Sequence, residues 1–171
     1  MKDSDQMEEE EIDTISEKIA VGAIKYAFLK ITVGRDIVFD IEKSISFDGD
    51  TGPYLMYVYS RCNSILKEAN FEATSTVCIS TCTENPVTRS LFSWVSRYKG
   101  VLLDSAVDYS PSTLTQYLFN LGQSFNSFYQ NVRVVDASDE ERDTLLVLVK
   151  ATMIVMKDGL SKLGIGVVER M

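Results

Sequence analysis

The sequence predicts an all-α protein, a bundle of helices within a chain of 171 residues. Two observations carry this prediction. Three segments repeat apolar residues at steps of three and four, as helices with one buried face do, and two further segments do so more weakly. Strand-like alternation is nearly absent. The composition, 45% hydrophobic and 25% charged, is that of a globular chain and not of a disordered one.

The N-terminal part combines an acidic leader with the first helix. The leader, residues 1–11, is polar. Thr14 followed by Glu17 fits a capping box, so we expect a helix to begin near Thr14 and to end by Gly34. Asp36–Asp40 alternates briefly and is the only candidate strand. The first helix buries one apolar face, formed by Ile12, Ile15, Ile19, Ala23 and Tyr26.

The middle of the chain predicts a loop, a long helix and two shorter ones. Turn-forming residues fill 47–53, and Pro53 suits the first turn of a helix over Tyr54–Ala69. The segment 70–85 has no strong period and predicts a connector. A helix starting at Pro86 is expected to break at Gly100, before a shorter helix over residues 101–107.

The C-terminal part predicts the two clearest helices. One begins at Pro111 after Ser110 as N-cap, and its apolar residues run from Leu114 to Phe128. The second follows a capping-box pair, Ser138 with Glu141. The apolar face of this second helix contains Leu145, Leu148, Val149, Met153 and Met156, and Gly159 lies near its end.

Composition excludes several kinds of chemistry. The chain has no histidine, so imidazole cannot serve as a base, nucleophile activator or metal ligand. Its three cysteines form no paired framework, and Cys78 with Cys82 falls short of the four ligands of a structural zinc site. We expect reduced thiols in an intracellular protein. No apolar run is long enough to span a membrane.

The net charge of −8 argues at first sight against a polyphosphate partner. The charge is concentrated, however. Residues 1–20 hold two lysines and eight acidic residues, a net of −6, and residues 136–143 hold one arginine and five acidic residues, a net of −4. The rest of the surface can therefore carry a local aromatic or basic face.

One such face is predicted on the helix after Pro53. Tyr54, Tyr57 and Arg61 fall at 0°, 300° and 340° around the helix, a stripe about 60° wide at 100° per residue. Two phenol rings and a guanidinium can stack on unpaired bases and hold a phosphate. The spacing equally fits half-buried packing tyrosines beside an arginine that extends to solvent.

Order and spacing of three blocks resemble the C-terminal part of an arginyl-tRNA synthetase, a class I enzyme. The first block is VGAIKYAFLK…RDIVFD, residues 21–40. The second is GDTGPYLMYVYSRCNSIL, residues 49–66. The third runs from PSTLTQYLFNLGQSFNSFYQNVRV to the terminal ERM, residues 111–171. The resemblance implies the helical bundle of the class I synthetase anticodon-binding type, preceded by a short remnant of the catalytic body.

The resemblance also implies which residues meet the tRNA. The family's Y-x-x-Y-x-x-x-R stripe faces the anticodon stem and loop, and the tyrosine of its FY pair and its terminal methionine reach anticodon bases. The matching positions in this chain are Tyr54, Tyr57, Arg61, Tyr129 and Met171. Asn120 and Asn126 are expected as polar neighbours. The implied partner is tRNA-Arg, with no DNA and no membrane.

The catalytic signatures of that family have no counterpart here. Its HIGH-type motif contains histidine, and its KMSKS-type loop would lie upstream of Met1. We therefore expect no catalytic residue, no metal ligand and no cofactor in this chain, since ATP and magnesium would belong to the full-length enzyme. Residues 1–53 would then end the catalytic body, and 54–171 would form the anticodon-binding domain. The missing catalytic half is a further implied partner, and the cytoplasm is the expected location.

A second class of function remains open. A helical protein-interaction module could keep this fold without binding RNA, and the acidic leader and the net charge favour it. The salt dependence of RNA binding distinguishes a tRNA-binding domain from a protein-interaction module, because phosphate contacts weaken steeply as the salt concentration rises.

Overall fold

A computed structural model describes residues 9–72, 84–134 and 137–171. In these residues every regular element is an α-helix, which confirms the predicted all-α class. The helices are α1 (Glu9–Leu29), α2 (Ile41–Ser44), α3 (Gly52–Glu68), α5 (Pro86–Ser96), α6 (Tyr98–Val107), α7 (Pro111–Asn131) and α8 (Asp139–Lys162).

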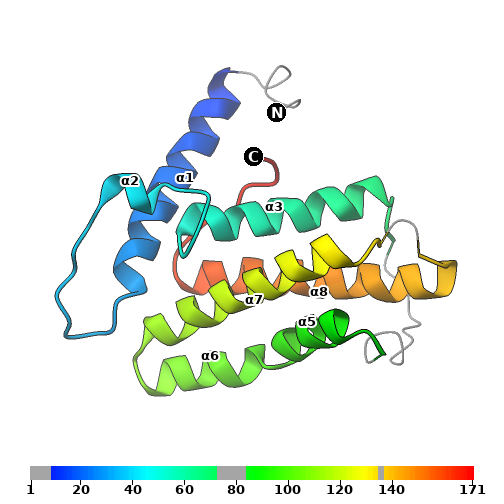
Figure 1. Cartoon of the computed structure of the whole chain (residues 1–171). Helices are drawn as coiled ribbons and strands as arrows, with labels where there is room; N and C mark the ends of the chain where they lie inside the picture. The colour runs from blue at the N-terminus through cyan, green and yellow to red at the C-terminus, as the bar shows by residue number, and fades with distance from the viewer. Residues whose placement is uncertain (1–8, 73–83, 135–136) are drawn as a thin grey trace.

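Three long helices, α3, α7 and α8, run side by side and form the body of the bundle (Figure 1). The pair α5 and α6 packs along α7, and α1 crosses the beginning of α3 at one end. The core between them is built from residues with almost no exposed surface. These include Leu55, Met56, Leu118, Leu121, Phe125, Phe128, Met156 and Leu160.

Local sequence explains where the helices begin. Thr51 precedes α3, and its hydroxyl accepts a hydrogen bond from the Tyr54 amide at 3.2 Å while Pro53 occupies the first turn. Asn85 caps α5 in the same way before Pro86. The helices predicted after Pro53, at Pro86 and at Pro111 are confirmed, with α3 starting two residues early. Ser110 precedes α7 as predicted, but its hydroxyl makes no capping hydrogen bond to the helix backbone.

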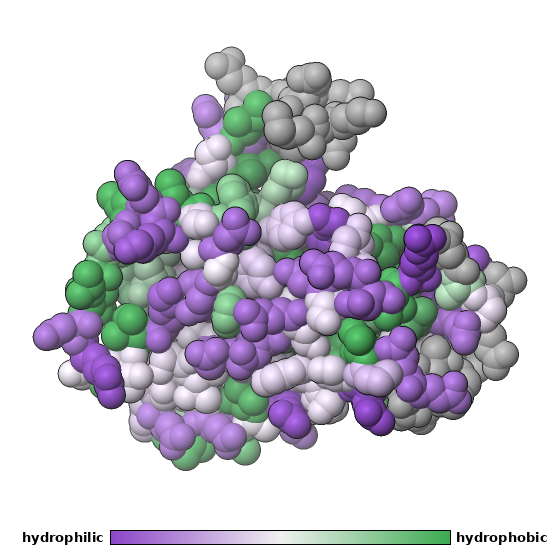
Figure 2. Space-filling view, viewed as in Figure 1, coloured by the Kyte–Doolittle hydropathy of each residue, from purple (hydrophilic) through white to green (hydrophobic). Residues whose placement is uncertain are grey.

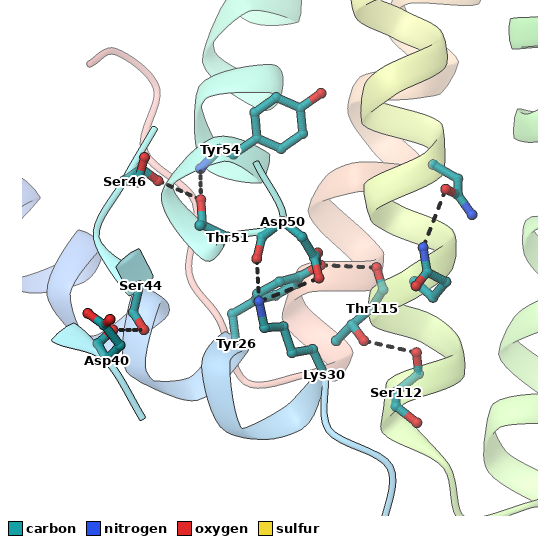
Figure 3. A network of polar contacts seen from close by, with 12 residues as sticks. Tyr26, Lys30, Asp40, Ser44, Ser46, Asp50, Thr51, Tyr54, Ser112 and Thr115 are labelled. Carbon is teal, nitrogen blue, oxygen red and sulfur yellow. Dashed lines mark hydrogen bonds and ion pairs between the residues drawn. The ribbon is translucent and has the colours of Figure 1, made fainter. Parts of the chain in front are cut away.

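A polar network ties α1 to the start of α3 and to α7 (Figure 3). The buried Tyr26 hydroxyl donates to Asp50 Oδ1 at 2.6 Å and lies 3.2 Å from the Thr115 carbonyl oxygen. Lys30 Nζ donates to the Asp50 carbonyl at 2.7 Å. Thr51 in turn donates to the Ser46 carbonyl at 2.6 Å. The loop before α3 is thereby fixed against two helices.

Two predictions about the N-terminal part are wrong. Thr14 is not a cap: α1 begins at Glu9, and the Thr14 hydroxyl bonds to the Glu10 carbonyl at 2.8 Å inside the helix. Asp36–Asp40 forms no strand in the described structure, because no second strand is there to pair with it. Asp40 instead caps α2 by accepting from the Lys43 amide.

Two further predictions need correction. Gly100 lies inside α6, and the break between α5 and α6 falls at Arg97. Ser138 does precede α8, but its hydroxyl donates to the Glu141 carboxylate at 2.9 Å and makes no bond to the helix backbone. Of the predicted connector 70–85, residues 73–83 lie outside the described residues, as do Cys78 and Cys82.

Neither a membrane helix nor a metal cluster is found within residues 9–72, 84–134 and 137–171. No helix there is both long and apolar enough to cross a bilayer. Among the described residues, no three cysteine, aspartate or glutamate side chains come together as metal ligands would. Cys62 is a free thiol in the core, and burial raises its pKa, so it is not a reactive nucleophile.

Candidate nucleic-acid interface

An arginine between two tyrosine rings forms the most distinctive surface feature. The Arg61 guanidinium carbon lies 5.0 Å from the centre of the Tyr57 ring and 4.5 Å from that of Tyr129. The guanidinium also contacts the Tyr57 hydroxyl. Tyr57 and Arg61 are half-buried, and Tyr129 is 42% exposed. We call Tyr57, Arg61 and Tyr129 the aromatic–arginine cluster.

Two helices supply this cluster. Tyr57 and Arg61 are four residues apart and so share one face of α3. Tyr129 comes from the last turns of α7, where its ring stacks on buried Phe125 with centroids 6.4 Å apart. Gly122 lets the two helices approach, because a side-chain carbon there would lie 3.2 Å from the Tyr54 ring.

Tyr54 belongs to the α3–α7 contact and presents little of its ring. It is 8% exposed, and the ring meets Phe119 edge-on at 5.8 Å. Its hydroxyl accepts a hydrogen bond from the Asn126 amide at 2.9 Å. Burial raises the pKa of this hydroxyl, and the bond from Asn126 opposes the rise. Tyr54 can therefore offer its hydroxyl, but not a ring face, to a ligand.

The two predicted asparagines occupy different environments on α7. Asn126 lies three residues before Tyr129 on α7, donates to the Tyr54 hydroxyl and retains a side-chain oxygen that can accept a further bond. Asn120 accepts a bond from Gln116 Nε2 at 3.4 Å, one turn earlier on the same helix. Of the two, the structure brings Asn126 directly to the predicted tyrosines.

The C-terminal tail lies along another side of α3. The buried Ser60 hydroxyl donates to the Val168 carbonyl at 2.7 Å, and Asn63 Nδ2 donates to the Glu169 carbonyl at 3.0 Å. Lys67 and Glu169 form an ion pair at 3.4 Å. Met171 ends this tail and is 38% exposed. The exposed strip of α3 thus has α7 on one side and the tail on the other.

Sequence reasoning missed Phe119, Ser60 and Asn63. Phe119 stands seven residues before Asn126, so helical spacing alone could have placed both on the same face. No sequence signal could have identified Ser60 and Asn63, because their partners are backbone carbonyls of the tail.

The groups exposed on this surface are suited to binding. Aromatic faces and a guanidinium can hold unpaired bases and a phosphate. The chain contains no histidine, so the cluster has no imidazole base beside it. Two aspartates accept structural hydrogen bonds from tyrosine hydroxyls: Asp50 accepts from Tyr26, and Asp158 accepts from Tyr98.

Comparisons with known proteins agree with the geometry. A family model described as the DALR anticodon binding domain matches residues 55–171. Arginine–tRNA ligase of Clostridium beijerinckii is 39% identical over 160 residues, which are 93% of this chain and 28% of that ligase. The ligase of Flavobacterium psychrophilum is 34% identical over 95% of this chain and 27% of its own length.

A solved structure agrees over almost the whole chain. Arginyl-tRNA synthetase of Thermus thermophilus superposes with a TM-score of 0.87 at 29% identity, covering 99% of this chain and 29% of that one. This chain therefore spans less than a third of the length of each of these three relatives.

Proposed function

The chain belongs to the DALR anticodon-binding domain family, and from this premise we propose that it is the tRNA-binding portion of an arginine–tRNA ligase. Its task is to dock the anticodon loop of tRNA-Arg. The surface that performs this task is the aromatic–arginine cluster of Tyr57, Arg61 and Tyr129.

The observation that carries the proposal is the position of Arg61 between two tyrosine rings. Anticodon bases are unpaired, so each can stack on a ring face, which contributes roughly 1–3 kcal/mol per base. A guanidinium offers several donors in one plane and can bind a phosphate while it stays stacked. The cluster therefore supplies both kinds of contact in one place.

Neighbouring groups would read the bases. The Tyr54 hydroxyl and the Asn126 side-chain oxygen are hydrogen-bonding groups on the same two helices, α3 and α7, as the cluster. Met171 adds an apolar side chain from the tail. Asn120 is a more distant candidate, since it already pairs with Gln116.

The chemistry of the full ligase would reside elsewhere. Attachment of arginine with ATP and magnesium would be performed by the part of the enzyme that this chain does not match. Residues 1–53 would join that part, and residues 54–171 would form the anticodon-binding domain. The complete enzyme would work in the cytoplasm, where its tRNA is used. The isolated chain should bind tRNA without charging it.

Binding of tRNA-Arg transcripts tests the proposal, with anticodon-changed transcripts as the comparison. We expect the wild-type chain to prefer the native anticodon, and Tyr57→Ala or Arg61→Ala to weaken both affinity and preference. Few basic groups are available, so binding by the isolated chain should be weak at physiological salt. If both variants bind like the wild type, the cluster is not the interface.

A helical protein-interaction module is the second candidate. The net charge of −8 favours it, because that charge repels polyphosphates. The absence of any measurable tRNA binding at low salt would support this alternative over the first.

A further inference from the structure

A hollow of about 640 Å³ opens between α1, α3, α8 and the C-terminal tail, and we call it the tail hollow. Figure 1 shows the tail entering the angle between α1 and α3. Small-molecule sites commonly enclose roughly 300–1,000 Å³, so the tail hollow is large enough for an organic ligand. Its charged lining distinguishes it from the hydrophobic surface that Figure 2 shows at the edge of the molecule where α2 lies in Figure 1.

Positive charge exceeds negative charge in the tail hollow, although the whole chain has a net charge of −8. Each of the four surrounding elements contributes one cation. The cations lie far apart in the sequence, so their convergence becomes visible only in the folded chain. The charged residues of the lining, with a net charge of +2, are Lys18, Lys67, Lys157, Arg170, Glu11 and Glu169.

Two of the four cations are paired and two are not. Arg170 and Lys67 each form an ion pair with a glutamate of the lining, at 2.6 Å and 3.4 Å. Lys18 on α1 and Lys157 on α8 form no ion pair or hydrogen bond with another described residue. Their two ammonium groups can therefore neutralise an anion with two negative charges. A phosphomonoester is such an anion, since it carries roughly −1.5 to −2 at pH 7.

The two ion pairs leave the tail hollow open to an anion. The four side chains that form them are between 42% and 75% exposed. Exposed pairs are weak because water screens them. An entering phosphate can therefore also accept hydrogen bonds from Lys67 and Arg170, and a guanidinium can bind two phosphate oxygens at once.

Apolar side chains also line the tail hollow. Tyr59 and Val168 are 5% and 3% exposed, and Ile15 is half-buried. Inorganic phosphate would leave these side chains in contact with water. An aromatic or aliphatic group attached to the phosphate would cover them, and removing apolar surface from water favours binding.

We propose that the tail hollow binds a small phosphomonoester. Lys18 and Lys157 hold the phosphate group from opposite elements, α1 and α8. The organic part of the ligand lies against Ile15, Tyr59 and Val168. The lining therefore recognises both halves of the ligand, the charged group and the apolar group.

The tail hollow and the aromatic–arginine cluster lie on different faces of α3. Tyr59 is two residues from Tyr57 and two from Arg61, so at 100° per residue it points about 160° away from both. A base stacked on the cluster is thus separated from the hollow by the helix itself. The inference goes beyond the proposed function and does not depend on it.

Titration of the 171-residue chain with phenyl phosphate tests the proposal. The test variant is Lys18→Gln with Lys157→Gln. The control is Lys99→Gln with Lys150→Gln, which removes two exposed lysines outside the hollow, on α6 and α8. Both double variants have the same net charge, so a difference between them reports position and not total charge. Calorimetry measures affinity, and NMR shifts of the backbone amides locate the ligand.

We expect phenyl phosphate to bind the Lys18→Gln/Lys157→Gln variant about tenfold or more weakly than the wild type, because charge-assisted hydrogen bonds to the phosphate are lost. The control variant should bind like the wild type. In the wild type, the amides of residues 167–170 should shift on titration. Equal affinities for the three proteins, or shifts that spare the tail and α1, would overturn the proposal.

Binding of tRNA-Arg distinguishes a small phosphomonoester from the phosphates of a nucleic acid. We expect the two double variants to bind tRNA equally well. A loss of tRNA affinity confined to Lys18→Gln/Lys157→Gln would overturn the proposal, because the hollow would then hold RNA phosphates. Normal tRNA binding without phenyl phosphate binding would refute the tail hollow alone, and the reverse result would refute the anticodon role alone.

Discussion

Arg61 on α3 lies over the ring of Tyr129 on α7, with its guanidinium carbon 4.5 Å from the ring centre. Such a contact at an exposed site contributes about 0.5–1 kcal/mol. Its larger consequence is geometric, because it fixes the orientation of a partly exposed ring before any ligand arrives. A ring that is already ordered loses less conformational entropy when a base stacks on it.

The first prediction is that Arg61→Lys weakens tRNA-Arg binding about fivefold, the equivalent of about 1 kcal/mol, without changing its salt dependence. Lysine keeps the charge but lacks the planar group that stacks on Tyr129. Arg61→Gln should weaken binding further and reduce the salt slope by about one phosphate contact. Fluorescence anisotropy over a salt series measures both quantities.

Arg97 provides the control for this prediction. Its guanidinium lies 5.3 Å from the Trp94 ring at the junction of α5 and α6, so it makes the same kind of contact elsewhere on the surface. Arg97→Lys should leave tRNA affinity unchanged. Because both variants keep the charge, equal losses for Arg61→Lys and Arg97→Lys would show that the effect of losing a guanidinium is not specific to the aromatic–arginine cluster.

The second prediction concerns Gly52 at the start of α3. A side-chain carbon there would lie 2.7 Å from the Gly22 carbonyl oxygen and 3.1 Å from Tyr26 Cβ. Backbone cannot move aside as a flexible side chain can, so α1 and α3 must separate. We expect Gly52→Ala to lower the free energy of unfolding by about 1–3 kcal/mol in urea denaturation.

Gly100→Ala is the matched control. Gly100 lies inside α6, and its added carbon would meet nothing within 4 Å. Alanine in a helix interior is favoured over glycine by roughly 0.5–1 kcal/mol, so this variant should be more stable than the wild type. A shift in the same direction for both alanine variants would refute the close-approach argument for Gly52.

Helical spacing predicted part of the site correctly for a physical reason. Tyr57 and Arg61 share a face because four residues make about one turn, and this holds whatever packs nearby. The burial of the Tyr54 ring could not be predicted, since it depends on Phe119 and Gly122 of α7. The position of Tyr129 over Arg61 likewise requires the α3–α7 packing.

The two incorrect predictions about the fold also have local physical causes. Asp36–Asp40 has the alternation of a strand, but a strand needs a partner, and Asp40 gains a bond to the α2 backbone instead. The low helix propensity of glycine predicts a break at Gly100, but one exposed glycine destabilises a helix by only about 1 kcal/mol. Neighbouring helical residues offset that amount.

The third prediction is a loss of stability above pH 10. Burial raises the pKa of several tyrosine hydroxyls, and that of Tyr26 is raised further by its hydrogen bond to Asp50. Above the ordinary tyrosine pKa of 10.0, the unfolded chain releases a proton that the folded chain retains. Stability from this group is therefore complete below pH 10 and declines above it, by about 1.4 kcal/mol per pH unit. The other raised tyrosines are Tyr54, Tyr59, Tyr98 and Tyr117.

Tyr26→Phe isolates the contribution of the most buried hydroxyl. This variant should be less stable at neutral pH, because Asp50 loses a donor, but its stability should fall less steeply between pH 10 and pH 11. Urea unfolding at a series of pH values measures the slope. Identical slopes for the variant and the wild type would show that Tyr26 ionises normally in the folded protein.

The last prediction connects the tail to tRNA binding. The buried Ser60 hydroxyl donates to the Val168 carbonyl at 2.7 Å, three residues before Met171. Ser60→Ala should leave that carbonyl without its partner, lower stability by about 1 kcal/mol and release the tail, so that tRNA affinity falls. Hydrogen exchange of the tail amides and anisotropy measure the two effects.

Ser64→Ala is the control, because the Ser64 hydroxyl bonds at 3.1 Å to the Ser60 carbonyl within α3 and not to the tail. It should leave tail exchange and tRNA affinity unchanged. If Ser60 acts by placing Met171, then Ser60→Ala should weaken binding no further once Met171 is deleted, because the two changes remove one interaction. Additive losses would instead show that Ser60 affects the α3 face directly, and that Met171 contributes independently of where the tail is held.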